Sequence, residues 1–157
     1  MKYVIIAKEK GFTLIELMTV VSLIGILSAI AIPNFLKFRT ITKASEAKYN
    51  LGAIRSCEET YRAEKDMYFE CAPCPVDVPN GRLPKEEFTG GGKADFDTLG
   101  FHPVGGVWYR YSVTSTDGGL TNFLCRAEGD LDADGIVGEF NVNNVSKQIV
   151  HVDEDIY

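Results

Sequence analysis

The sequence predicts an α+β fold in which one long N-terminal helix packs against a C-terminal, four-stranded antiparallel sheet. Three observations carry this prediction. An uncharged apolar run from Leu17 to Leu36 leads into a helical pattern that continues to about residue 65. A stretch rich in proline and glycine follows, and short alternating segments begin after residue 106. The 157 residues are enough for one compact domain with an appended element.

The first half of the predicted helix, residues 12–38, is apolar on nearly all sides. Its twenty uncharged residues match the roughly 20 that a helix needs to cross a bilayer core. Gly25 and Pro33 interrupt this run. Because proline removes one helical hydrogen bond, we expect a kink or a local loosening near Ala29. This half is therefore predicted to span a membrane.

The second half, residues 39–65, has an apolar stripe at helical spacing. The stripe consists of Ala44, Ala47, Leu51, Ile54 and Tyr61. Charged residues are expected on the remaining surface: Lys43, Glu46, Lys48, Arg55, Glu59 and Arg62. The stripe is predicted to pack against the sheet.

Residues 66–106 are predicted to be an irregular connection with one short helix near Ala94 to Leu99. They contain five prolines and the run Gly90-Gly91-Gly92. Alternation of apolar and polar residues then predicts four strands within residues 107–152. Their approximate ranges are 107–113, 120–127, 136–142 and 148–152.

The charge distribution separates a basic start from an acidic remainder. The formal net charge of the chain is -6. Residues 1–11 contain three of the 16 basic residues and one of the 22 acidic residues, so the rest carries -8. The three lysines, Lys2, Lys8 and Lys10, would keep this end in the cytoplasm. The acidic remainder excludes nucleic-acid binding through simple phosphate contacts.

The segment Gly11-Phe12-Thr13-Leu14-Ile15-Glu16 lies where the basic start meets the apolar run. Here the chain resembles the type IV pilin family. Further segments resemble type IVa major pilins, notably those of gliding myxobacteria. These segments are residues 33–38, 43–48, 61–68, 99–101, 109–111 and 129–135.

The resemblance implies a precursor with a leader (residues 1–11), an assembly helix (12–38) and an exported head (39–157) with the pilin fold. A prepilin peptidase would cut after Gly11 and methylate the new amine of Phe12. The mature chain would leave the inner membrane of a Gram-negative bacterium through the pilus assembly machinery. It would then polymerise with copies of itself into an extracellular filament for motility, adhesion or uptake.

Glu16 is a carboxylate at the start of the apolar run, where a charge costs roughly 2.5–3.5 kcal/mol on insertion scales. The resemblance implies an assembly role for Glu16 and for Pro33. Cleavage after Gly11 would create a positive amine on Phe12, about one helical turn away. Pairing of Glu16 with the Phe12 amine of a neighbouring subunit would offset the cost of burial.

Two other functions remain open at this point. A pseudopilin of type II secretion shares the N-terminal segment, although the chain lacks the Asp-Pro-Trp-Gly-type stretch of those heads. The other alternative is a membrane-anchored, exported redox or metal-binding module. His102 and His151 are isolated, and no serine or cysteine is arranged with them as a nucleophile, so an enzyme is not predicted.

The four cysteines, Cys57, Cys71, Cys74 and Cys125, all follow the apolar run. In an exported head an even number of cysteines predicts structural disulfides. Four cysteines allow three pairings, and we expect Cys71 and Cys74 each to pair with Cys57 or Cys125. A zinc site would need the same residues.

Asp130, Asp132 and Asp134, followed by Gly135, have the spacing of a calcium loop. A full loop would need a glutamate where Asn141 stands, although Glu139 is an alternative in a shorter loop. A solvated turn is the default interpretation, so no cofactor is predicted and calcium is kept as an alternative.

Overall fold

The computed structural model describes residues 11–81, 85–146 and 148–151. The predicted leader, apart from Gly11, lies outside these residues. The chain divides into two compact units, one up to Lys37 and one from Phe38 onward. Each unit is treated by itself below.

Helix α1 runs from Leu14 to Lys65 and belongs to both units. It passes through Ala29 and Pro33 without a break in the helix. Large apolar side chains between Phe12 and Phe38 are 45% to 75% exposed. Among the described residues, α1 is the one helix long and apolar enough to cross a membrane. The predicted apolar half therefore exists as a helix whose apolar surface is uncovered in the single chain.

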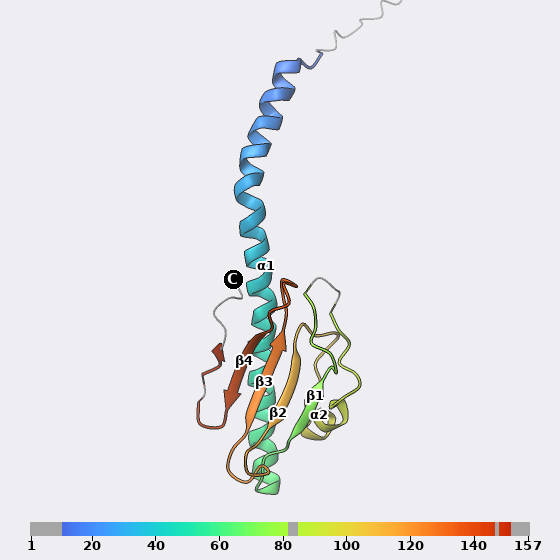
Figure 1. Cartoon of the computed structure of the whole chain (residues 1–157), viewed down its shortest axis with the longest axis vertical. Helices are drawn as coiled ribbons and strands as arrows, with labels where there is room; N and C mark the ends of the chain where they lie inside the picture. Colours follow the sequence, from blue (N-terminus) through green and yellow to red (C-terminus); the bar gives the residue numbers. More distant parts are fainter. Residues whose placement is uncertain (1–10, 82–84, 147, 152–157) are drawn as a thin grey trace, which may run out of the picture. The chain divides into compact units, whose positions relative to one another are not determined.

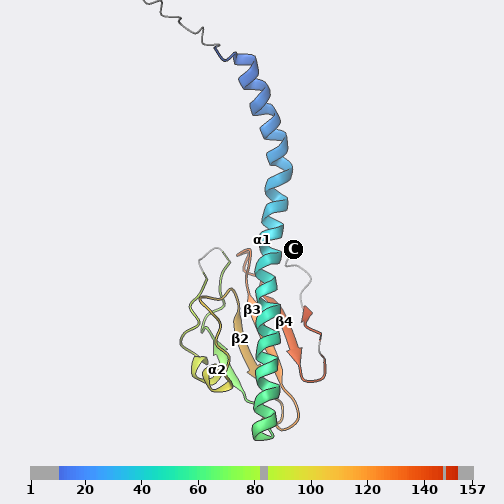
Figure 2. The same ribbon diagram turned by 180° about the vertical axis from the view of Figure 1, so that it is seen from behind.

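From Phe38 onward, α1 lies along one face of a sheet (Figure 1, Figure 2). Four residues of the predicted stripe are at most 1% exposed: Ala44, Ala47, Leu51 and Ile54. Tyr61 is partly buried against the same core. The periodicity therefore identified the packing face of the helix correctly.

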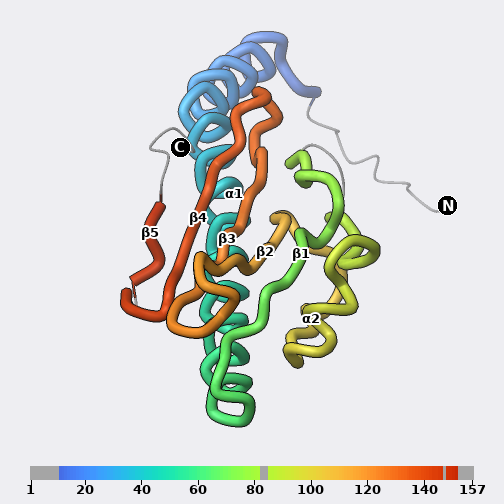
Figure 3. The backbone as a smooth tube through the Cα atoms, turned by 60° about the horizontal axis from the view of Figure 1, so that its bottom comes forward, coloured from blue at the N-terminus to red at the C-terminus, as the bar shows by residue number. Residues whose placement is uncertain are grey.

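The sheet has five antiparallel strands in the order β1-β2-β3-β4-β5 (Figure 3). The strands are β1 (Cys71–Cys74), β2 (Arg110–Thr114), β3 (Leu124–Gly129), β4 (Gly138–Asn143) and β5 (Val150–His151). Strands β2 to β5 match the four expected from the sequence. The short helix α2 (Lys93–Leu99) also lies where it was expected.

The prediction of four strands was wrong because it omitted β1. Pro73 lies inside this strand, and the surrounding prolines and glycines indicated a loop. A proline is tolerated in an edge strand, where one side of the backbone needs no ladder partner. Strand β1 is such an edge, and it pairs with β2 alone.

Lys43 is buried, although the sequence pattern placed it on the surface. Its Nζ donates to the carbonyl oxygens of Gly81 (2.7 Å) and Leu131 (3.4 Å). The ammonium also lies 4.3 Å from the centre of the Trp108 ring. A buried cation needs such partners. Lys43 therefore ties α1 to two loops and to the residues before β2.

Two more polar residues of α1 bind the sheet side directly. The carboxylate of Glu46 accepts a hydrogen bond from the backbone N–H of Trp108 (2.8 Å) and forms an ion pair with Lys85. The amide of Asn50 donates to the hydroxyl of Tyr111 (2.9 Å). Together with Lys43, these residues form a polar seam beside the apolar stripe.

We predict that Lys43→Met destabilises the head by about 1–3 kcal/mol, because two buried carbonyl groups lose their donor. The methionine retains the apolar stem, so the change reports the ammonium group. Thermal unfolding of the full chain in detergent measures the effect. Lys48→Met is the matched control, since Lys48 is an exposed lysine on the same helix. Equal stability of the two variants would contradict the role given to Lys43.

Candidate functional site

The start of α1 is built from Thr13 and Glu16. The helix begins at Leu14, so Thr13 precedes the first turn and Glu16 is its third residue. One carboxylate oxygen of Glu16, Oε2, accepts from the backbone N–H (2.9 Å) and the hydroxyl (2.6 Å) of Thr13. The Thr13 hydroxyl accepts the backbone N–H of Glu16 at 3.3 Å. This reciprocal pair is a capping box, which satisfies backbone donors that the first turn leaves free.

The capping box gives Glu16 a structural role at the start of α1, in addition to its charge. Sequence reasoning considered only its charge, although the pattern Thr13-x-x-Glu16 is itself a helix-start signal. None of the bonds to Thr13 uses the second oxygen, Oε1. A donor from another molecule therefore has an acceptor to bind without displacing the cap.

Gly11 and Phe12 precede the capping box and are both exposed. A Cβ atom built on Gly11 would have no atom of the described chain within 4 Å. The peptide bond after Gly11 is therefore open to a protease. Pro33, the other residue assigned to assembly, is exposed within the first unit.

The three aspartates of the predicted calcium loop lie together, with one carboxylate oxygen of each within 4.8 Å of the others. The fit to a cation is nevertheless incomplete. Asp130 accepts the backbone N–H groups of Ala133 (2.7 Å) and Gly135 (3.2 Å) through its two oxygens. Glu139 lies on β4 and pairs with Arg126 at 3.5 Å. Glu139, the alternative ligand, thus already has a cationic partner.

We predict that chelation with EGTA leaves the melting temperature of the head unchanged, because backbone N–H groups already bind Asp130. Differential scanning fluorimetry with calcium and with EGTA tests this. A melting shift on chelation that Asp132→Ala abolishes would establish a calcium site instead.

The structure contains the four cysteines as separate thiols. Cys71 pairs with Val113 in the sheet, and Val113 pairs with Cys125, so strand β2 lies between the two cysteines. Two strand spacings amount to roughly 10 Å between Cα atoms. A disulfide spans at most about 7 Å. Cys71 and Cys125 therefore cannot be bridged in this fold.

A bridge between Cys74 and Cys125 is opposed as well. Cys74 pairs with Tyr111 and Tyr111 with Ala127, which places Cys74 further still from Cys125. Each of the two expected pairings contains a bridge from Cys125 to Cys71 or to Cys74. The register therefore opposes the expected two-bridge framework, and a disulfide that includes Cys57 stays a prediction.

The thiols are also poorly suited to redox catalysis. Burial raises the pKa of Cys71 and Cys125, and it raises the pKa of Cys74 to about 11. The pKa of Cys57 is raised by burial and by the neighbouring Glu58. Reactive cysteines have lowered pKa values, because the thiolate is the nucleophile.

We predict that iodoacetamide labels Cys57 in the native chain, and that the other three cysteines react after unfolding. Cys57 is partly exposed, whereas Cys71, Cys74 and Cys125 are at most 2% exposed. Peptide mass spectrometry without reductant measures the labelling. Cysteines that resist labelling in denaturant until a reductant is added would reveal disulfides.

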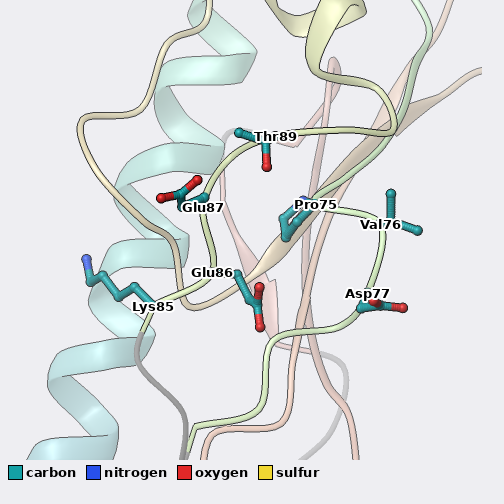
Figure 4. A pocket seen from close by; sticks show the side chains of 7 residues that line it. All are labelled: Pro75, Val76, Asp77, Lys85, Glu86, Glu87 and Thr89. Atoms are coloured by element: carbon teal, nitrogen blue, oxygen red, sulfur yellow. The ribbon is translucent and has the colours of Figure 1, made fainter.

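A surface cavity of about 550 Å³ lies between residues 75–77 and 85–89 (Figure 4). In Figure 4 the amine of Lys85 points toward α1, where it pairs with Glu46. The residues lining this cavity include no cysteine, histidine or serine. Elsewhere, His102 pairs with Asp97 at 2.9 Å, and the ring of His151 lies 4.7 Å from that of Phe140. None of these places joins a nucleophile to a base.

Comparison with known proteins agrees with the geometry at the start of α1. Residues 6–32 match the family described as the prokaryotic N-terminal methylation motif. The type IV major pilin protein PilA of Myxococcus xanthus is 40% identical over 111 residues, which are 71% of this chain and 40% of that protein. The chain thus aligns with less than half of that relative's length.

Two fimbrial proteins align over larger shares of their own length. The type IV major fimbrial protein FimA of Dichelobacter nodosus is 33% identical over 71% of this chain and 67% of its own. A fimbrial protein of Moraxella nonliquefaciens is 28% identical over 92% of this chain and 91% of its own. The processing motif, the long exposed helix and the helix-on-sheet head all agree with these matches, and the chain belongs to the type IV pilin family.

Proposed function

We propose that this chain is the structural subunit of a type IV pilus. One observation carries the proposal: the methylation-motif match extends into a helix with twenty consecutive uncharged residues, whose large apolar side chains are 45% to 75% exposed. Such a surface is not stable in water. It needs lipid before assembly and the helices of other subunits afterwards.

The proposed route begins at the inner membrane of a Gram-negative bacterium. A prepilin peptidase removes residues 1–11 and methylates Phe12. The pilus assembly machinery then extracts the subunit into an extracellular filament. Motility, adhesion and uptake are the functions for which such a filament is suited.

The proposed contact between subunits uses the free oxygen of Glu16. The amine of Phe12 from one subunit binds Oε1 of Glu16 in the next, while Thr13 keeps Oε2. A charge pair in apolar surroundings is much stronger than one in water. Each subunit would thus neutralise one buried carboxylate and one buried amine.

The relatives favour a pilus over a secretion pseudopilus, since those named above are described as pilins or fimbrial proteins. The raised pKa values of the thiols speak against the redox alternative. Family membership supports a structural role.

Mass spectrometry of the mature chain is expected to find Phe12 as the first residue, with one added methyl group. Gly11→Ala tests the cut, because a side chain at this position narrows the access of a protease. An N-terminus at Met1, or at a residue after Ala31, would contradict this route.

Glu16→Ala and Glu16→Gln separate the two roles of Glu16. Both remove the charge, but glutamine preserves the capping box and alanine does not. If the charge carries assembly, both variants accumulate as processed, folded subunits in the inner membrane, and filaments are lost. Electron microscopy of shear fractions and immunoblots of membranes measure this.

Thr13→Val is the matched control, because it removes the hydroxyl of the cap and leaves the carboxylate. We expect it to weaken the helix start by about 1 kcal/mol and to reduce filaments less than Glu16→Gln does. Normal filaments from Glu16→Gln would remove the electrostatic role from Glu16.

A further inference from the structure

Among the described residues of the head, one buried carboxyl group has a hydrogen-bond partner for only one of its two oxygens. Glu58 lies near the end of α1 and is 0% exposed. Its Oε2 accepts the backbone N–H of Phe69 at 3.0 Å. Its Oε1 has no hydrogen-bond partner within the described residues, and no basic side chain among them forms an ion pair with it.

Glu58 belongs to a set of contacts that joins the end of α1 to the residues before β1. We call this set the latch: Glu58, Tyr61 and Arg62 of α1 with Tyr68 and Phe69. The rings of Tyr61 and Phe69 lie 5.2 Å apart. Arg62 donates to the Tyr68 hydroxyl at 2.6 Å, and its guanidinium lies 4.8 Å from that ring.

The latch also reaches the turn between β2 and β3. The backbone N–H of Tyr68 donates to the carbonyl oxygen of Gly119 at 2.7 Å. The ring of Tyr68 lies 4.7 Å from that of Phe123. A change at Glu58 would therefore affect the contacts of the latch and of the turn between β2 and β3.

The groups around Glu58 do not compensate a negative charge. Cys57 and Glu59 flank it on α1, Cys71 faces it from β1 and Cys125 from β3. The only cation in the latch, on Arg62, is bound to Tyr68. Burial, with a smaller contribution from Glu59, raises the pKa of Glu58 to about 7, although the bond from Phe69 opposes the shift.

We propose that Glu58 makes the latch proton-dependent: the neutral carboxyl group keeps α1 closed on β1, and its ionisation as the pH rises to neutrality loosens this end of the head. The ionised group would be a charge in the core with one hydrogen bond. An uncompensated buried charge is strongly destabilising. The folded chain therefore binds this proton more tightly than the unfolded chain does.

The direction of the pH effect follows from linkage. The unfolded value is 4.5 and the folded value about 7. The stability that Glu58 contributes is complete below pH 4.5, is lost as the pH rises toward 7, and changes no further in alkaline solution.

The first experiment measures melting of the full-length chain in detergent between pH 5 and pH 8.5. It compares the native sequence with Glu58→Gln, which is neutral at every pH, and with Glu64→Gln, an exposed carboxylate on the same helix. We expect the native chain and Glu64→Gln to lose several degrees relative to Glu58→Gln as the pH rises. A difference between the native chain and Glu58→Gln that does not change with pH overturns the proposal.

The second experiment uses the buried thiols of the native chain as reporters and needs no substitution. In the reduced native chain, labelling of Cys71 and Cys125 requires opening between α1 and the sheet, whereas Cys57 is the partly exposed internal reference. We expect the ratio of Cys125 to Cys57 labelling to rise on the order of tenfold from pH 6 to pH 8.5. A constant ratio overturns the proposal.

A third variant tests the electrostatic cause. Glu59→Gln removes the neighbouring charge, so the carboxyl of Glu58 in the folded chain should ionise at lower pH. The loss of stability should then end at a lower pH and be smaller than in the native chain. An unchanged or opposite shift would contradict the assignment of the titration to Glu58.

Discussion

The rest of the structure depends on the ability of one helix to satisfy its own backbone hydrogen bonds over 52 residues. A helix needs no partner for its peptide groups, so it is stable in lipid and against a sheet alike. Only the polarity of the side chains therefore has to differ between the two halves of α1. From Leu17 to Leu36 they are uncharged, and from Lys43 onward one stripe is apolar and the rest polar. The first unit thus has an apolar surface that its own chain does not cover, which is the physical reason for a subunit that must bind copies of itself.

The polar seam decides how α1 sits on the sheet. An apolar stripe alone specifies which side of a helix is buried, but it tolerates a shift along the helix axis. Lys43, Glu46 and Asn50 each bind a partner on the sheet side, and these partners are backbone groups or a buried hydroxyl. A shift of one helical turn would leave all of them buried without partners, at a cost of about 1–3 kcal/mol each. Specific polar contacts therefore fix the register that hydrophobic burial leaves open.

Periodicity predicted the helix, its buried stripe and four strands, because these features repeat along the chain. Periodicity wrongly placed Lys43 on the surface, because residue type alone does not distinguish a lysine that binds two buried carbonyl groups from one in water. Periodicity also missed strand β1, because Pro73 is unfavourable in most strands. Proline is tolerated in an edge strand, but the sequence does not show which strand is an edge. At the candidate site, processing at Gly11 and Phe12 and the assembly role of Glu16 stay predictions from the motif. The pattern Thr13-x-x-Glu16 also predicts a capping box, but the prediction for Glu16 used its charge alone. The separation of the cysteines by β2 was not visible, because it depends on strand order.

Two carboxylates show how the same group serves assembly in one place and stability in another. Glu16 is exposed, and Thr13 binds one of its oxygens, so the other remains accessible to a donor from outside the chain. Glu58 also has one bound oxygen, but the core surrounds it and no external donor can reach it. In the two proposals above, the unused oxygen of Glu16 therefore binds a donor from a second molecule, whereas that of Glu58 carries a proton. Access from solvent, rather than residue type, separates a contact between subunits from a titration within one head.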